Sequence, residues 1–214
     1  MSESVSLQSL LTQTSSLKLG LIGAMDQEID RLKMSIDNAQ IQQIAGFDFY
    51  TGTLNGVEVV LLKSGIGKVN AAIGTALLID RFAPTCIINT GSAGGFDPNL
   101  NVGDVVISDE VRHHDVDLRV FGYEMGQVAQ MPAAFQSDPL LIEIAEGLIG
   151  KIKGIQTKRG LIATGDSFMH DPVRVAEVRK HFPTMKAVEM EAAAIAQTCY
   201  RFNIPFIVIR SLSD

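Results

Sequence analysis

Apolar runs and amphipathic stretches alternate along this 214-residue chain from Lys18 onward. Residues 18–24 form a short apolar run typical of a strand, and 26–36 carry apolar residues at helical spacing. A chain that alternates strands with helices builds a parallel or mixed sheet covered on both faces. We therefore predict one α/β domain, a three-layer α/β/α sandwich around a central mixed sheet. Further strands are predicted at 86–90, 105–108, 160–164 and 206–211, and further helices at 69–82, 139–149, 172–180 and 190–202.

Residues 41–63 have a different pattern, which indicates an antiparallel part of the sheet. Phe47, Phe49 and Tyr50 alternate with polar residues, and residues 57–62 return as a second strand. The Asn-Gly pair at 55–56 between them is a strong signal for a tight hairpin turn.

Charge and cysteine content narrow the class of partner and the compartment. A net charge of −6 and a pI near 5.2 disfavour a nucleic-acid surface, which needs Lys and Arg to neutralise phosphates. Cys86 and Cys199 alone indicate no disulfide framework and favour a reducing cytoplasm. Residues 1–16 lack a signal peptide's basic start and apolar block, and no run of 18 apolar residues occurs. We expect a flexible tail over 1–16, a domain over 17–214, and no nucleic-acid or membrane partner.

Polar groups stand at the ends of four apolar runs, at 24–28, 90–95, 188–192 and 210–214. Ligands in α/β proteins bind at the loops that follow the strands. Glu189 and Glu191, only two residues apart at a predicted helix start, cannot share a helix face. One suits a solvated position favoured by the helix dipole, and the other is free to bind the two hydroxyls of a ribose.

Two further carboxylates stand at the same predicted edge of the sheet. Asp214 follows a buried strand, where partial desolvation would raise the pKa of its carboxyl enough for it to donate a proton near neutrality. Its plainer interpretation is a turn aspartate. Glu28 faces the same edge if the strands are parallel, although a first-turn helix carboxylate is the better interpretation from sequence alone.

Three patterns invite other functions. Gly-Ile-Gly-Lys at 65–68 lacks the spacing of a phosphate loop or dinucleotide fingerprint, so we interpret it as a tight turn lining a different pocket. His113 and His114, with Asp115 and Asp117, lack a closing ligand with metal-site spacing and are interpreted as a polar loop. Ser92 has no histidine placed to activate it, so it is predicted to contact a ligand rather than act as a nucleophile.

Taken together, the segments 23–28, 64–68, 89–95, 165–168, 188–193 and 213–214 resemble the bacterial 5′-methylthioadenosine/S-adenosylhomocysteine nucleosidases. The resemblance runs from about Lys18 to Asp214 and implies a nucleoside phosphorylase-like fold. Phosphorylase relatives carry a Gly-Asp-Pro…Arg phosphate motif where this chain has Gly-Ala-Met…Glu. A carboxylate repels phosphate and can take a proton from water, so hydrolysis is the favoured reaction.

The resemblance implies cleavage of the N-glycosidic bond of methylthioadenosine, S-adenosylhomocysteine and 5′-deoxyadenosine, in methionine salvage and methyl-cycle detoxification. Glu28 would deprotonate the attacking water, with Arg210 and Ser92 nearby. Asp214 would protonate the leaving adenine. No metal or organic cofactor is implied, because side chains supply the acid and the base. Other substrate contacts carried over from the family are Ala93, Gly94, Glu189 and Ser213, with Met190 and Glu191 on the ribose and Phe168 and Met169 on adenine.

The apolar pocket for the 5′ substituent corresponds to Met25, Ile66 and Phe121. In the family the last of these reaches across from a second subunit, so the resemblance implies a homodimer. A loop and a long helix follow the Ser-Asp motif in the family, whereas this sequence stops at Asp214. We therefore expect a domain that lacks the family's C-terminal helix, and its activity stays open. A phosphate-dependent phosphorylase, a non-catalytic adenine-nucleoside binding module and hydrolases of related nucleosides such as aminodeoxyfutalosine remain alternatives.

Overall fold

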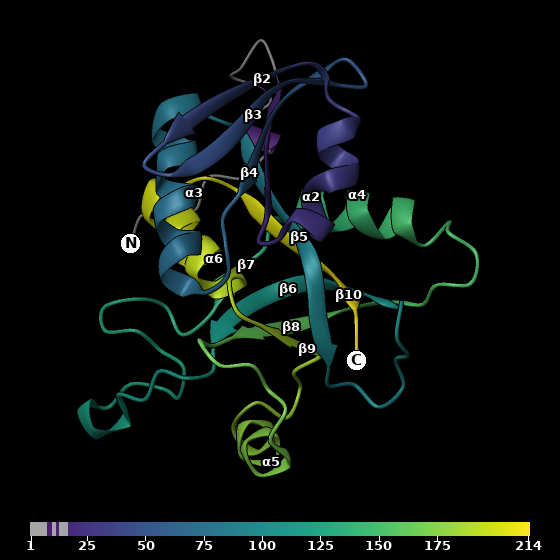
Figure 1. Cartoon of the computed structure of the whole chain (residues 1–214). Coiled ribbons are helices and arrows are strands. Elements are labelled where there is room, and N and C mark those ends of the chain that lie inside the picture. Colours follow the sequence, from purple (N-terminus) through teal and green to yellow (C-terminus); the bar gives the residue numbers. More distant parts are fainter. Residues whose placement is uncertain (1–7, 10–11, 13–16) are drawn as a thin grey trace.

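The chain folds into three layers, with a mixed sheet between two groups of helices (Figure 1). This computed structural model describes residues 8–9, 12 and 17–214. Helices α3 (Lys68–Phe82) and α6 (Ala192–Phe202) pack on each other and on one face of the sheet. Helices α2 (Asp26–Met34) and α4 (Pro139–Ile149) cover the other face. The predicted sandwich is confirmed.

Ten strands form a single sheet within the described residues, in the order β10-β6-β8-β9-β5-β1-β4-β3-β2, with β7 paired to β6. An additional pairing joins β10 to β5, so five of the strands close on themselves. The pairs β1–β4, β1–β5, β5–β10, β6–β8 and β8–β9 are parallel and the others are antiparallel. The strands are β1 (Lys18–Gly23), β2 (Asp37–Ile44), β3 (Phe47–Leu54), β4 (Val57–Lys63), β5 (Cys86–Gly95), β6 (Val105–His113), β7 (Phe135–Gln136), β8 (Thr157–Thr164), β9 (Ala187–Glu189) and β10 (Phe206–Leu212).

Side-chain alternation along the central strands builds a core on both faces of the sheet. In β10, Val208 belongs to the cluster that contains α3 and α6, and Ile207 belongs to the cluster beneath α4. In β1, Ile22 joins the first of these clusters and Leu21 packs with Ile29 of α2. Each such side chain contributes about 1.5–3 kcal/mol when fully buried. The continuous apolar runs of the sequence are therefore strands buried on both faces.

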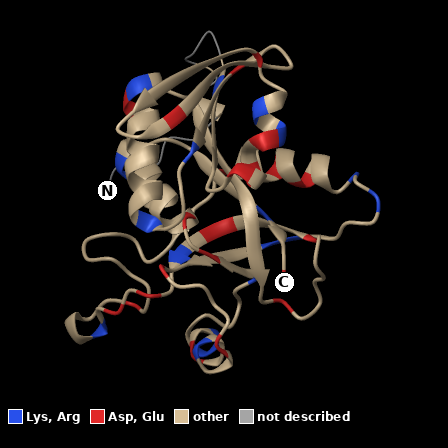
Figure 2. Cartoon of the chain, in the orientation of Figure 1, with Lys and Arg blue, Asp and Glu red and all other residues tan. Residues whose placement is uncertain are grey.

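Helix ends follow from local chemistry. Asp138 precedes α4 and accepts hydrogen bonds from the backbone N–H groups of Leu140 (3.0 Å) and Leu141 (3.2 Å), and Pro139 suits the first helical position. Helix α2 has acidic residues in its first turn and basic residues in its last, which complements the helix dipole (Figure 2). Helix α5 (Pro172–His181) and the 3-10 turn η1 (Arg119–Phe121) are the other helical elements within residues 17–214.

The antiparallel region is confirmed. Strands β3 and β4 pair in register up to Leu54 and Val57, and the two residues between them, Asn55 and Gly56, have φ of 49° and 81°. Those positive values match a type I′ turn, whose twist fits that of the flanking strands. Strand β2 begins at Asp37, earlier than the predicted meander.

Several predicted boundaries were wrong because pairing partners extend the strands. Strand β5 continues to Gly95 rather than stopping at Gly91, since β10 pairs with it as far as Ala93 and β9 pairs with Gly94 and Gly95. Strand β6 continues to His113, and both adjacent histidines are buried, 5% and 4% exposed. His113 therefore belongs to β6 rather than to the predicted loop, whereas His114 lies in the loop that follows, with its side chain buried.

The predictions for the N-terminal tail, for a membrane-spanning segment and for the cysteines have different outcomes. The flexible tail predicted over 1–16 falls outside them except at 8–9 and 12. None of the helices in the described part of the chain has the length and apolar character needed to cross a bilayer. Cys86 and Cys199 are both buried free thiols, and burial raises their pKa, to about 12 for Cys86.

Candidate functional site

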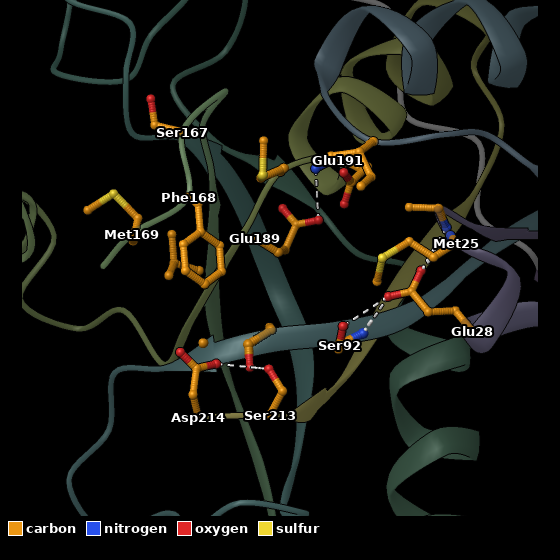
Figure 3. A pocket seen from close by; sticks show the side chains of 16 residues that line it. Met25, Glu28, Ser92, Ser167, Phe168, Met169, Glu189, Glu191, Ser213 and Asp214 are labelled. Carbon is orange, nitrogen blue, oxygen red and sulfur yellow. Dashed lines mark hydrogen bonds between the residues drawn. The ribbon is translucent and has the colours of Figure 1, made fainter. Parts of the chain in front are cut away.

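A cavity of about 190 Å³ opens at the ends of β1, β5, β9 and β10, where the sequence placed its polar groups. Figure 3 shows Phe168 and Asp214 on one side of it and Met25 and Glu28 on the opposite side. Its lining comprises Ala24, Met25, Glu28, Ile66, Ser92, Ala93, Gly94, Ser167, Phe168, Met169, Val188, Glu189, Met190, Glu191, Ser213 and Asp214.

Glu28 is held in place by four hydrogen bonds on the wall beside α2. Its Oε2 accepts from the backbone N–H groups of Ala24 (2.8 Å) and Met25 (3.2 Å). Its Oε1 accepts from the backbone N–H (2.8 Å) and the hydroxyl (3.1 Å) of Ser92. Four donors on one carboxylate fix its orientation, and the side chain still lines the cavity. The prediction that Ser92 lies beside Glu28 is confirmed.

Glu189 is the centre of a buried network behind the cavity. Its Oε2 accepts from the backbone N–H groups of Glu191 (2.9 Å) and Ala192 (2.8 Å) and from Nη2 of Arg210 (2.5 Å). Its Oε1 accepts from the hydroxyl of Thr164. The side chain is 3% exposed, so Glu189 is not the solvated helix-start carboxylate that we considered. It instead satisfies the first N–H groups of α6 and neutralises a buried guanidinium.

Glu191 is the carboxylate of the cavity lining that can accept further hydrogen bonds. It is 6% exposed, and its Oε1 accepts a hydrogen bond from the backbone N–H of Gly67 at 2.9 Å. Burial and the neighbouring Glu189 carboxylate raise the pKa of Glu191, while the Gly67 N–H and Arg210 counteract them, and the result is about 7. Near neutrality this group can therefore both accept hydrogen bonds and, when protonated, donate one.

Asp214 and Phe168 form the side opposite Glu28. Asp214 Oδ1 accepts from the hydroxyl of Ser213 at 2.8 Å, and the Ser213 N–H donates to the carbonyl of Ala93 at 3.0 Å. Asp214 is exposed, so the partial desolvation predicted for its carboxyl is not observed. Phe168 is 69% exposed, and its ring stacks on His170, with 5.9 Å between centroids and 22° between planes.

Most of the predicted site residues line this one cavity, and two of them lie away from its wall. Arg210 is 1% exposed, and its Nη2 donates hydrogen bonds to Asn89 (2.8 Å) and Glu189. Its predicted contact with the substrate stays a prediction. Phe121 is 74% exposed on η1 and does not line the cavity of its own chain. That position suits the prediction that it serves a second subunit, which stays a prediction.

The Gly-Ile-Gly-Lys segment is a tight turn at the cavity mouth, as predicted. Gly65 and Gly67 have φ of 76° and 94°, in the left-handed region that favours glycine. The turn places Ile66 on the cavity wall and directs the N–H of Gly67 to Glu191. Within the described residues, no group of three or more His, Cys, Asp or Glu side chains could hold a metal ion.

The sequence analysis did not identify Thr164 and Asn89, which hydrogen-bond the buried Glu189 and Arg210 next to the cavity. Thr164 donates to Glu189 and accepts from the backbone N–H of Ala193 at 2.8 Å. Asn89 accepts from Arg210 and donates to the carbonyl of Ile22 at 3.0 Å. A buried polar side chain at the end of an apolar strand was the available signal, because such groups require partners.

Comparison with known proteins identifies the family. The family model described as the phosphorylase superfamily matches residues 18–214. The chain belongs to the phosphorylase superfamily. Within it, the 5′-methylthioadenosine/S-adenosylhomocysteine nucleosidase of Pseudoalteromonas translucida (strain TAC 125) is 60% identical over 198 residues, 92% of this chain and 84% of that protein.

Solved structures of other phosphorylase-superfamily members have the same fold as this chain. A nucleosidase of that same name from Neisseria meningitidis, in complex with methylthio-immucillin-A, has 53% identity and a TM-score of 0.91, over 92% of this chain and 85% of its own. The Colwellia psychrerythraea 34H nucleosidase, in complex with adenine, has 53% identity and a TM-score of 0.90, over 94% and 83%. The resemblance found in the sequence is confirmed.

Proposed function

We propose that this chain is an N-glycosyl hydrolase that cleaves 5′-methylthioadenosine and S-adenosylhomocysteine to adenine and the corresponding thioribose products. The single observation that carries the proposal is Glu28, a carboxylate held by four donors at the cavity wall. The relatives that are 53–60% identical bear the name of this activity. The same site suits 5′-deoxyadenosine, which lacks only the thioether substituent.

Glu28 favours water over phosphate as the attacking group. Phosphorolysis brings a multiply charged anion to the anomeric carbon, and a carboxylate at that place repels it. Water is neutral, and a carboxylate beside it can remove a proton as the new C–O bond forms. The hydrogen bonds from Ala24, Met25 and Ser92 keep Glu28 aimed at the cavity while it does so.

The remaining lining accounts for the other parts of such a substrate. The carboxylate oxygens of Glu191 can accept hydrogen bonds from the two ribose hydroxyls. The negative charge of this group also stabilises the positive charge that develops on the sugar. Phe168 offers an exposed aromatic face for the base. Asp214, on the same side of the cavity, would protonate the leaving adenine (Figure 3). Met25 and Ile66 provide the apolar surface that a thioether needs.

The biological setting is part of the proposal. We assign the chain to methionine salvage and the removal of S-adenosylhomocysteine, because both proposed substrates carry a methionine-derived sulfur on an adenine nucleoside. Its two buried free thiols suit the reducing cytoplasm. A homodimer is supported by the exposed Phe121, which would complete the thioether pocket of the neighbouring subunit.

Adenine release from 5′-methylthioadenosine, measured with and without phosphate, tests the proposal. Release in phosphate-free buffer at the same rate as with phosphate is the expected result. Release that requires phosphate would favour a nucleoside phosphorylase. Binding of adenine nucleosides, seen by calorimetry, without any release would favour a non-catalytic binding module. Parallel assays with S-adenosylhomocysteine and aminodeoxyfutalosine would rank the 5′ substituents.

A further inference from the structure

Asp115 joins two segments that line the cavity, although it does not line the cavity itself. It follows β6, and its Oδ1 accepts from Nζ of Lys68 at 2.7 Å while its Oδ2 accepts from the backbone N–H of Asp166 at 2.9 Å. The backbone N–H of Lys68 donates in turn to Oδ1 of Asp166 at 2.8 Å. The three residues therefore form a closed ring of hydrogen bonds, which we call the Asp115 ring.

The Asp115 ring connects opposite parts of the site. Lys68 immediately follows the turn that carries Ile66 and the Gly67 N–H bound to Glu191. Asp166 immediately precedes the segment of Ser167, Phe168 and Met169. One side of the ring thus holds the wall assigned to the ribose and the 5′ substituent, and the other holds the wall assigned to the base. Their separation decides whether one nucleoside can contact both walls.

The Asp115 ring has the properties of a structural link between the two segments rather than of a reactive group. The side chains of Lys68 and Asp115 are 20% and 29% exposed, so their ion pair is partly shielded from water. Burial pushes the pKa of Asp115 upward, but the hydrogen bonds from Lys68 and from the Asp166 N–H outweigh it and lower the pKa. Asp115 therefore keeps its charge at neutral pH. Asp166 also caps the N-terminus of α3, beside a glycine whose φ is 94°.

We propose that Asp115 is a positioning residue that sets the distance between the base-binding and ribose-binding walls. The proposal rests on the function proposed above for what the two walls bind. Asp115 touches neither the cavity nor Glu28 and Asp214, so its loss should loosen substrate binding more than it slows the bond-breaking step. The carboxylate acts through Lys68 and Asp166, and removing it opens the ring at two points.

Steady-state adenine release from 5′-methylthioadenosine tests this in Asp115→Ala, Lys68→Met and the double variant. Asp115→Ala should raise KM about tenfold and lower kcat by less than about threefold. Adding Lys68→Met to it should raise KM little further, because both changes open the same ring. Asp138→Ala is the matched control, since Asp138 also caps a helix, while its backbone N–H donates to Phe206, the first residue of β10, at the opposite end of that strand from Asp214. It should lower stability and leave KM unchanged.

Hydrogen exchange gives a readout that is independent of turnover. Amides in 64–70 and 165–170 should exchange faster in Asp115→Ala than in the wild type, and at wild-type rates in Asp138→Ala. An unchanged KM, unchanged exchange in both segments, or an equal rise of KM in Asp138→Ala would overturn the positioning role. If the wild type releases no adenine, the proposed hydrolysis fails, whereas exchange rates and the calorimetric Kd for 5′-methylthioadenosine, which spans both walls, still decide the role of Asp115.

Discussion

Replacement of Glu191 by glutamine should change how stability depends on pH. The pKa of Glu191 is raised in the folded chain from 4.5 to about 7, first by burial and then by Glu189. A carboxyl whose pKa rises on folding stabilises the protein fully below pH 4.5 and loses that contribution as pH rises toward 7. At about 1.4 kcal/mol per pKa unit, the loss is about 3 kcal/mol. Glutamine does not titrate, so the variant keeps its stability across this window.

Urea unfolding of the wild type and Glu191→Gln at pH 4.5 and pH 8 measures this effect. The variant's free energy of unfolding, relative to the wild type, should increase by about 3 kcal/mol between the two pH values. Glu177→Gln on α5 is the control, because its exposed carboxylate has a lowered pKa beside Lys180. Its effect should be small and of opposite sign. If the difference in unfolding free energy between the wild type and Glu191→Gln changes by less than about 1 kcal/mol across the range, the pKa of Glu191 is not raised on folding.

Three further substitutions have expected outcomes. Arg210→Met leaves Glu189 buried without its cation and should lower the free energy of unfolding by about 3–5 kcal/mol in urea titrations; a loss below about 1 kcal/mol would show that the pair is dispensable. Gly67→Ala forces a φ of 94° on alanine and should cost about 1–2 kcal/mol, checked by thermal melting. Phe168→Ala, at a ring 69% exposed, should leave stability within about 0.5 kcal/mol but weaken adenine binding in calorimetry by about 1–3 kcal/mol. An unchanged adenine affinity would remove Phe168 from the base site.

The fold and much of the site could be predicted from the sequence because local signals agreed with the tertiary structure. Helix α4 has its predicted bounds, set by a capping aspartate, a proline at the first position and a glycine after the last turn. The cavity lining came from polar residues placed just beyond apolar strands, since the ends of neighbouring strands meet at one edge of a sheet.

Other features depend on partners that are distant in the sequence. The glycines of β5 have low strand propensity, yet pairing with β9 and β10 keeps 91–95 in the strand. Nη2 of Arg210 donates to Glu189 and Asn89, which are 21 and 121 residues away in the chain. The segment at 113–117 suggested only a metal site or a polar loop. Its Asp115 bonds Lys68 and Asp166, 47 and 51 residues away in the chain.

Glu28→Gln tests whether Glu28 acts as the base that activates water. Glutamine has nearly the same size but cannot remove a proton. In phosphate-free buffer, the variant should release adenine from 5′-methylthioadenosine with a kcat at least about 100-fold below that of the wild type. Its Kd for adenine should be unchanged, because the base site lies across the cavity. A variant kcat within about tenfold of the wild type would rule out Glu28 as the base.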